Sequence, residues 1–309
     1  MNAVVAPFPR DELKRRVVEF VRGSSTEISP HDEGLIEELA GVLPPGTVVY
    51  VAHTPKAKID DVVRVATKVQ AHGLNASPHI VARRIESERA LRRALEQLGE
   101  AGISQVLLVA GDLNPPAGSF TSTLQILDSG AIVDAGIKTV GVAGHPEGHP
   151  AVGPEVLWDA LRHKQAFADR TGLRVHIATQ FGFNPEGVRA WERQLTERGI
   201  TLPIHAGIAG PTPIAKLIKF AVACGVGASF GSLMKNVGNM SKLASGAAAS
   251  PEELLVRFVN AGAGTRESRL VQPHFYAFGG VMVTARWLRA IMRGAIELSA
   301  EADKFKVDA

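Results

Sequence analysis

The sequence is poor in cysteine: Cys224 is the single one among 309 residues. One cysteine excludes an internal disulfide and any metal site built from several thiolates. We interpret Cys224 as a small buried apolar residue. Because a lone cysteine is typical of proteins kept in a reducing compartment, the sequence predicts a cytoplasmic protein.

Long apolar runs and a dominant charge are also missing. No stretch approaches the roughly 18 apolar residues of a membrane span, and the first residues, MNAVVAPFPRDELKRR, lack the apolar core of a signal peptide. Lysine and arginine number 34 against 31 acidic residues. The densest basic stretch, Arg83 to Arg93, is interrupted by Glu86 and Glu88, so we interpret it as a solvated helix face. Neither a membrane nor a nucleic acid is expected as a partner.

Short β-branched runs alternate with helical patterns along the chain, as expected of βαβ units. We predict an α/β fold, a (β/α)8 TIM barrel that forms a single domain over residues 1–309, with the barrel at about 24–295. A helix at about 10–22, centred on Asp11–Val21, precedes it. The eight predicted strands are Ser24–Ser29, Val48–Ala52, Ala76–Ala82, Gln105–Ala110, Thr139–Gly144, Arg174–Gln180, Pro203–Ile208 and Pro273–Gly279.

Six connecting helices show apolar residues at intervals of three and four: Ile59–His72, Glu86–Ala101, Val156–Thr171, Pro185–Arg198, Pro213–Cys224 and Pro251–Ala261. Pro185, Pro213 and Pro251 are predicted to occupy first-turn positions, where a missing N–H costs nothing. The small-residue segment Gly225–Gly246 predicts an extra helix and a loop over the barrel mouth.

In a barrel of this kind, functional groups gather where strands end. Polar side chains stand at most of the predicted strand ends, among them Glu27, His53, His79, Asp112, His145, Gln180 and Tyr276. Glu27 is the most informative, because a carboxylate between Thr26 and Ile28 inside a strand costs several kcal/mol to desolvate unless it is paired or its pKa rises. A raised pKa suits a general acid.

Other kinds of site are disfavoured by their local sequence. His145 and His149 have helical zinc-ligand spacing, but HPEGHP contains two prolines and a glycine, so no helix presents both rings to one ion and no metal is expected. No Gly-x-Ser-x-Gly elbow and no Gly-x-Gly-x-x-Gly fingerprint follows a strand.

Taken in order, the strand-end motifs resemble the methylenetetrahydrofolate reductase family over roughly Ser24 to Gly280. The matching pieces are SSTEISP, SPHIVA, LLVAGD, VAGHPEGHP, IATQFGF, AGIAGPTPIAKLIKFA and HFYAFGG. Each motif is short, and the resemblance rests on their colinear order.

The resemblance implies roles for individual residues. Glu27 resembles the catalytic acid that protonates a folate nitrogen, and Asp112 resembles the aspartate that lies between flavin and pterin. Cofactor contacts are expected at His53, His79, Gly111, Ala143 and His145, with Lys164 as the partner of a phosphate. Substrate contacts are expected at Gln180, Phe183, Ile208, Ile214 and Tyr276.

The implied function is a flavin-dependent oxidoreductase that interconverts 5,10-methylene- and 5-methyltetrahydrofolate, with FAD bound and NADH or NADPH as co-substrate. The partners would then be small molecules, and a homo-oligomer is left open. Ala110 stands where the family usually has an arginine, which motivates a flavin-independent alternative. A physiologically oxidative direction, and a non-redox folate-binding protein or methyltransferase, are further alternatives.

Overall fold

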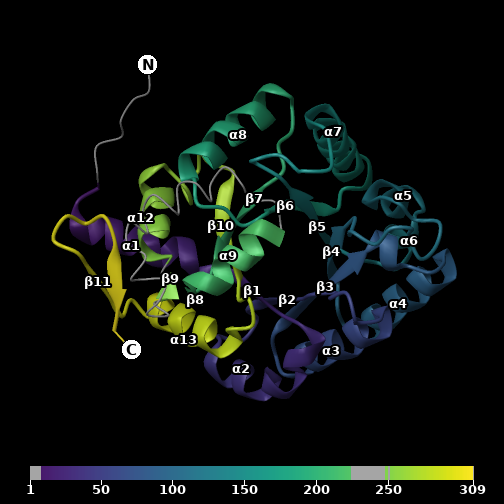
Figure 1. Cartoon of the computed structure of the whole chain (residues 1–309), viewed down its shortest axis with the longest axis horizontal. Coiled ribbons are helices and arrows are strands. Elements are labelled where there is room, and N and C mark those ends of the chain that lie inside the picture. The colour runs from purple at the N-terminus through teal and green to yellow at the C-terminus, as the bar shows by residue number, and fades with distance from the viewer. Residues whose placement is uncertain (1–7, 224–247, 250, 309) are drawn as a thin grey trace. The chain divides into compact units, whose positions relative to one another are not determined.

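The computed structural model describes residues 8–223, 248–249 and 251–308 (Figure 1). Eight strands are hydrogen-bonded into a closed parallel barrel in the order β1-β10-β7-β6-β5-β4-β3-β2, which confirms the predicted fold class. Each predicted run overlaps one of them, and the ends of the strands differ from the predicted ends by up to three residues. The strands are β1 (Ser25–Ile28), β2 (Val48–Val51), β3 (Asn75–Val81), β4 (Gln105–Val109), β5 (Thr139–Gly144), β6 (Arg174–Thr179), β7 (Ile204–Ala209) and β10 (Leu270–Tyr276).

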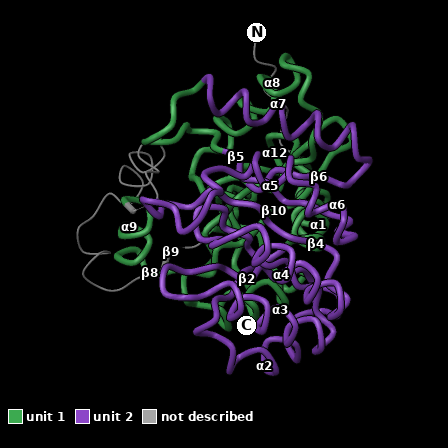
Figure 2. Tube along the Cα trace, turned by 90° about the vertical axis from the view of Figure 1, so that its right-hand side faces the viewer, with its two compact units in different colours: residues 1–24, 145–154, 179–309 green, residues 25–144, 155–178 purple. Residues whose placement is uncertain are grey.

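The chain forms two compact units, which Figure 2 shows in different colours. Unit 1 comprises residues 1–24, 145–154 and 179–309, and unit 2 comprises residues 25–144 and 155–178. Both units are discontinuous in sequence. The assignment of the whole chain to one domain stays a prediction.

Unit 2 contains β1 to β5, residues 174–178 of β6 and the helices that lie between these strands along the chain. The helical elements are η1 (Pro30–Leu35), α2 (Ile36–Val42), α3 (Ile59–Ala71), η2 (Ala82–Arg84), α4 (Glu88–Glu100), α5 (Thr123–Asp128), α6 (Ala131–Asp134) and α7 (Pro154–Thr171). Figure 1 shows α3 and α4 beside each other, outside β3 and β4. Helix α4 buries Leu91, Ala94, Leu95 and Leu98, which lie three and four residues apart on one face, as its sequence pattern predicts.

Unit 1 contains the predicted N-terminal helix, α1 (Arg10–Arg22), which packs against α12 and α13. The Arg10 guanidinium donates hydrogen bonds to the carbonyl oxygens of Leu298, Ser299 and Ala300, which ties α1 to the C-terminal hairpin. The other elements are α8 (Pro185–Glu197), β8 (Thr212–Pro213), α9 (Ile214–Ala223), β9 (Ala248–Ala249), α12 (Glu252–Asn260), α13 (Val281–Met292), β11 (Ile296–Leu298) and β12 (Phe305–Val307).

Two of the three proline predictions are wrong. Pro185 does begin α8, but Pro213 is the last residue of β8 and pairs with Ala248, while Pro251 is the N-cap of α12. The reason is shared: an edge strand and an N-cap both tolerate a residue without an N–H, so a proline does not distinguish them from a first helical turn.

Several elements have no counterpart in the sequence prediction. Helices α2, α5 and α6 are too short to show a periodic pattern, and α13 begins with the β-branched Val281, Val283 and Thr284, which disguise a helix. Cys224 and the segment predicted over Gly225–Gly246 lie outside the described residues. No helix in the described part of the chain has the length and apolar character needed to span a membrane.

Candidate functional site

The carboxyl group of Glu27 lies in β1 of unit 2, where the sequence places it. The residue is half-buried, and burial raises its pKa to about 8, with a smaller contribution from the negative charge of Asp32. The Asp32 carboxylate is held by the N–H and the hydroxyl of Ser29, at 2.9 and 2.7 Å, at the start of η1. Glu27 is therefore protonated at neutral pH, as a general acid requires.

An uncharged polar cluster lies beside β1 in the same unit. Tyr50 is the β2 register partner of Glu27, and its hydroxyl is hydrogen-bonded to Nε2 of His176 at 2.8 Å. The ring of His79 meets the Tyr50 ring edge-on, with 5.9 Å between centroids. Burial lowers the pKa of His176 to about 4 and that of His79 to about 3, so both rings are neutral at pH 7.

Gly141 makes room for this cluster. A Cβ atom at that position would lie 2.9 Å from Nε2 of His176 and 2.7 Å from Cδ1 of Leu107. The Tyr50–His176 pair was not foreseen from the sequence. The sequence did offer a signal for it, because Tyr50 and His176 both lie at interior positions of predicted strands.

Three buried polar atoms, on two residues that follow β2 and on one residue inside β3, have no hydrogen-bond partner among the described residues: Nδ1 of His53, Oγ1 of Thr54 and Nε2 of His79. The other ring nitrogen of His53 bonds the carbonyl oxygen of Ala57 at 3.1 Å, and burial lowers the pKa of that ring. Buried polar atoms are rarely left unpaired in native proteins. These atoms therefore fit a ligand that carries hydrogen-bonding groups.

Gly111 and Asp112 follow β4. Gly111 has a φ of +84°, and a Cβ there would overlap with Cγ1 of Val81, so only glycine fits. The Asp112 side chain is 85% exposed and forms an ion pair of 3.0 Å with Arg84, which is 13% exposed.

Arg84, which pairs with the predicted site residue Asp112, was not singled out from the sequence. Both Arg83 and Arg84 precede α4, so the solvated-face interpretation is wrong for them. It holds for Arg92, which pairs with Glu88 and Asp134, and for Arg93, which pairs with Asp60. The missed signal was position: the two arginines come directly after a strand end, where this fold places functional groups.

Lys164 projects from α7 toward β5, and its ammonium lies 3.4 Å from the carbonyl oxygen of Ala143. The side chain is buried, and burial lowers its pKa to about 8. In unit 1, His145 begins the segment that follows β5, and its ring meets that of His149 edge-on at 5.1 Å. Within the described residues, no group of three or more His, Cys, Asp or Glu side chains could hold a metal ion.

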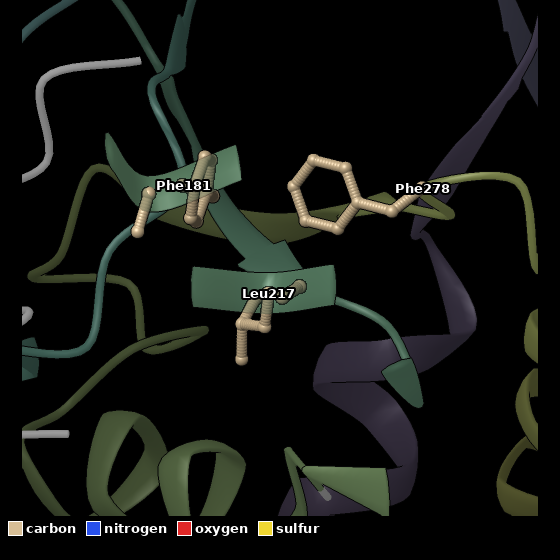
Figure 3. Packing of buried hydrophobic residues seen from close by; sticks show 5 residues of the cluster. Phe181, Leu217 and Phe278 are labelled. Carbon is tan, nitrogen blue, oxygen red and sulfur yellow. The ribbon is translucent and has the colours of Figure 1, made fainter. Parts of the chain in front are cut away.

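Unit 1 gathers five aromatic rings near the ends of β6 and β10. Phe181, Phe278, Ala209, Leu217 and Ala221 form a buried cluster, on which Phe183, Phe220 and Tyr276 pack half-buried. Figure 3 shows the Phe278 ring directed toward Phe181, with 5.0 Å between the centroids. Phe278 also stacks on Phe220 at 4.4 Å. The predicted substrate residues Phe183 and Tyr276 thus share one aromatic surface.

The chain around Gln180 is fixed by contacts with its neighbours. The N–H of Gly207 donates to Oγ1 of Thr179 at 2.8 Å, and the Tyr276 hydroxyl donates to the Thr179 carbonyl oxygen at 2.9 Å. Oε1 of Gln180 accepts the N–H of Phe181 at 3.2 Å. Ile208 and Ile214, predicted to wall the cleft, are both buried.

The predicted site residues fall into two sets. Glu27, His53, His79, Gly111, Asp112, Ala143 and Lys164 belong to unit 2, whereas His145, Gln180, Phe183, Ile208, Ile214 and Tyr276 belong to unit 1. Each set has its own internal contacts. That the two sets act on one ligand stays a prediction.

The chain was compared with known protein families and with solved structures. Residues 44–237, more than half of the chain, match the methylenetetrahydrofolate reductase family. Among solved structures, a candidate phosphonomutase from Burkholderia cenocepacia is 10% identical, with a TM-score of 0.48 over 93% of this chain and 100% of that chain. The dihydropteroate synthase of Thermus thermophilus is 14% identical, with a TM-score of 0.44 over 85% and 89%. At these values the two structures carry no argument about this chain.

Proposed function

Because the chain belongs to the methylenetetrahydrofolate reductase family, we propose that it interconverts 5,10-methylene- and 5-methyltetrahydrofolate, with FAD bound and NADH or NADPH as electron partner. The protein would serve one-carbon metabolism in the cytoplasm, and its 5-methyl product would supply methionine biosynthesis.

The observation that carries this proposal is the state of Glu27. Opening the methylene bridge requires a proton on the folate nitrogen that leaves the carbon, and an ordinary glutamate has lost its proton at neutral pH. Burial raises the pKa of Glu27 to about 8, so this side chain still carries a proton at pH 7.

The proton of Glu27 would pass to that nitrogen as the carbon–nitrogen bond breaks. The carbon is left as an iminium on the other nitrogen, and addition of a hydride gives the methyl group. In the reverse direction the Glu27 carboxylate would take the proton back. Asp112 would hold the pterin through hydrogen bonds, and Gln180 would contact the folate.

The flavin is supported by the unpaired polar atoms of unit 2. Buried Nδ1 of His53, Oγ1 of Thr54 and Nε2 of His79 would find hydrogen-bond partners on the bound flavin. The backbone at Gly111 and Ala143, with His145, would complete the contacts, and Lys164 would face a phosphate. When bound, FAD would accept hydride from the nicotinamide and pass it to the folate.

The aromatic surface of unit 1 would receive the ring systems of the substrate. Phe183, Phe220 and Tyr276 are half-buried, so part of each ring is accessible. Aromatic side chains stack favourably on planar ligands. Ile208 and Ile214 would pack behind this surface.

Absorbance spectroscopy of the purified protein tests the proposal. We expect a flavin spectrum that bleaches on anaerobic addition of NADH or NADPH, or of 5-methyltetrahydrofolate. Glu27→Gln should keep the nicotinamide-dependent bleaching and lose the folate-dependent reaction by about 100-fold or more. Glu37→Gln, a change at an exposed position of α2, is the matched control. Equal loss of both half-reactions in Glu27→Gln would contradict the proposal.

A second candidate is direct hydride transfer from a nicotinamide to the folate without flavin. Ala110 favours it, because this position before Gly111 offers no cation to a flavin phosphate. A colourless protein whose turnover does not change on addition of FAD would support this candidate. A protein that binds folate but supports no redox turnover would instead be the non-redox binding protein or methyltransferase.

A further inference from the structure

We propose that Arg84 is the positioning residue for Asp112: it holds the Asp112 carboxylate in one orientation and supplies the positive charge beside it. This inference rests on the proposed function, in which Asp112 contacts the pterin.

The contacts of Arg84 fix its guanidinium between two strand ends. Nη1 donates to the carbonyl oxygen of Pro55, which follows β2, and Nη2 donates to Oδ1 of Asp112, which follows β4; both distances are 3.0 Å. Because a backbone carbonyl anchors one side of the planar guanidinium, the orientation of its other side is set.

The exposures of the two partners show which one orders the other. The Arg84 side chain is 13% exposed, whereas the Asp112 side chain is 85% exposed. A carboxylate this open to water has little packing to restrict its rotation. Arg84 is its one ion-pair partner within the described ranges, so the arginine determines where the charge of Asp112 lies.

The neighbouring Arg83 makes different contacts, so it serves as a matched control for Arg84. Nε of Arg83 donates to the carbonyl oxygen of Leu113 at 2.7 Å, and its N–H donates to the carbonyl oxygen of Ala110 at 3.0 Å. Arg83 therefore holds the backbone of the loop after β4, while Arg84 holds the carboxylate that the loop carries.

A double-mutant cycle separates positioning of Asp112 from general support of the loop. The dissociation constant of 5-methyltetrahydrofolate is measured by calorimetry for Arg84→Gln, Asp112→Asn and the double variant. We expect Arg84→Gln to weaken binding about tenfold alone, but less than about twofold once Asp112 is replaced. Arg84→Lys, which keeps the charge and cannot bridge both partners, should be intermediate. Arg83→Gln should have the same effect in both backgrounds.

Equal effects of Arg84→Gln with and without Asp112 would overturn the inference, because the arginine would then act through something else. Failure of the wild-type protein to bind folate would contradict the proposed function instead. In that case, ligand-free structures of the wild type and of Arg84→Gln test whether Arg84 positions Asp112. We expect one Asp112 rotamer in the wild type and more than one in Arg84→Gln, with the backbone of 110–114 unchanged. A single, unmoved rotamer in Arg84→Gln would refute the proposal.

Discussion

At the scale of single residues, Glu27 links the pH to the direction of the reaction. With a pKa of about 8, its carboxyl is protonated through the neutral range and ionised in mild alkali. The proposed reductive direction needs the protonated form and the oxidative direction needs the ionised form. The two directions should therefore respond to pH in opposite senses.

Steady-state rates from pH 6 to 9.5 check this. We expect the reduction of methylenetetrahydrofolate to fall as the pH rises through about 8, and the oxidation of methyltetrahydrofolate to rise over the same interval. Parallel profiles for the two directions would mean that another group controls the proton. Glu37→Gln should leave both profiles in place.

The Tyr50 hydroxyl is a second residue with a measurable contribution. Tyr50→Phe removes the hydrogen bond to Nε2 of His176 and should lower the free energy of unfolding by about 1 to 3 kcal/mol, because the bond is buried. Urea denaturation at pH 7 measures the change. Tyr276→Phe, which removes a half-buried hydroxyl bonded to the Thr179 carbonyl oxygen, is the comparison and should cost less. A Tyr50→Phe protein as stable as the wild type would show that the Tyr50 hydroxyl adds nothing to stability.

At the scale of elements, the close approach of β7 to the end of β6 depends on Gly207. A Cβ atom there would overlap with the carbonyl oxygen of Thr179 and would come within 2.8 Å of that of Gln180. Both obstacles are backbone atoms, so the end of β6 itself would have to move.

Gly207→Ala should therefore weaken folate binding about tenfold through displacement of Gln180, and it should destabilise the protein by about 1 to 3 kcal/mol. Calorimetric binding and denaturant unfolding give the two numbers. Gly199→Ala serves as the control for folding alone, since nothing lies near a Cβ there and only its φ of +71° opposes the change. Unchanged folate binding in Gly207→Ala would indicate that Gln180 does not contact the substrate.

Helix α4 offers a test of local stability. The Ser87 hydroxyl oxygen accepts the N–H of Ala90 at 3.1 Å and so caps the helix. Ser87→Ala should lower the free energy of unfolding by about 1 kcal/mol. Ser87→Asp, whose carboxylate can also cap the helix, should keep most of this stabilisation. Thermal or urea unfolding measures both changes. An equal loss of unfolding free energy in the two variants would argue against a capping role for Ser87.

The elements also show how far pattern reasoning extends. All eight strands and seven helices could be predicted, because the strands are short β-branched runs bounded by turn residues and the helices show apolar residues at intervals of three and four. Helix α6 is only four residues long, less than two helical turns, so its sequence contains no period to detect. Prolines occur at first helical turns, at edge strands and at N-caps, so the sequence around Pro213 and Pro251 did not determine which of these positions they occupy.

The site was predicted unevenly for a physical reason. Glu27 could be singled out because a carboxylate between Thr26 and Ile28, inside a predicted strand, is conspicuous in the sequence itself. Arg84 could not, because its role comes from the Pro55 carbonyl and from Asp112, which are 29 and 28 residues away. The interaction of Tyr50 with His176 likewise depends on two strands that are not neighbours in the sequence.

At the scale of the whole molecule, the buried groups of unit 2 determine how stability depends on pH. The pKa of Glu27 rises from 4.5 to about 8, while those of His79 and His176 fall from 6.5 to about 3 and about 4. From pH 4.5 to 6.5 the unfolded chain binds up to two more protons on His79 and His176 and one fewer on Glu27. His53, whose pKa is also lowered, adds to the effect of the histidines, so stability increases with pH. Above pH 6.5 the unfolded chain binds one proton fewer on Glu27, so stability decreases until Lys164, with a folded pKa of about 8, begins to lose its proton.

These shifts predict a maximum of stability near pH 6.5. Glu27→Gln should abolish the decrease between pH 6.5 and 8 and should be more stable than the wild type at pH 8, by on the order of 2 to 4 kcal/mol. Above pH 8, the lowered pKa of Lys164 should make stability rise again. Urea unfolding at intervals from pH 4 to 10 tests all three parts. A wild-type curve without a decrease above pH 6.5 would mean that Glu27 ionises normally.

The space beside Gly141, which the ring of His176 fills, makes these two positions dependent on each other. An alanine at 141 is expected to be harmful alone and better tolerated when a smaller side chain replaces the imidazole, with Cδ1 of Leu107 left as the remaining close neighbour of the added Cβ at 2.7 Å. Substitutions at the pair should therefore be compensatory. In an alignment of relatives, a larger residue at the first position should accompany a smaller one at the second.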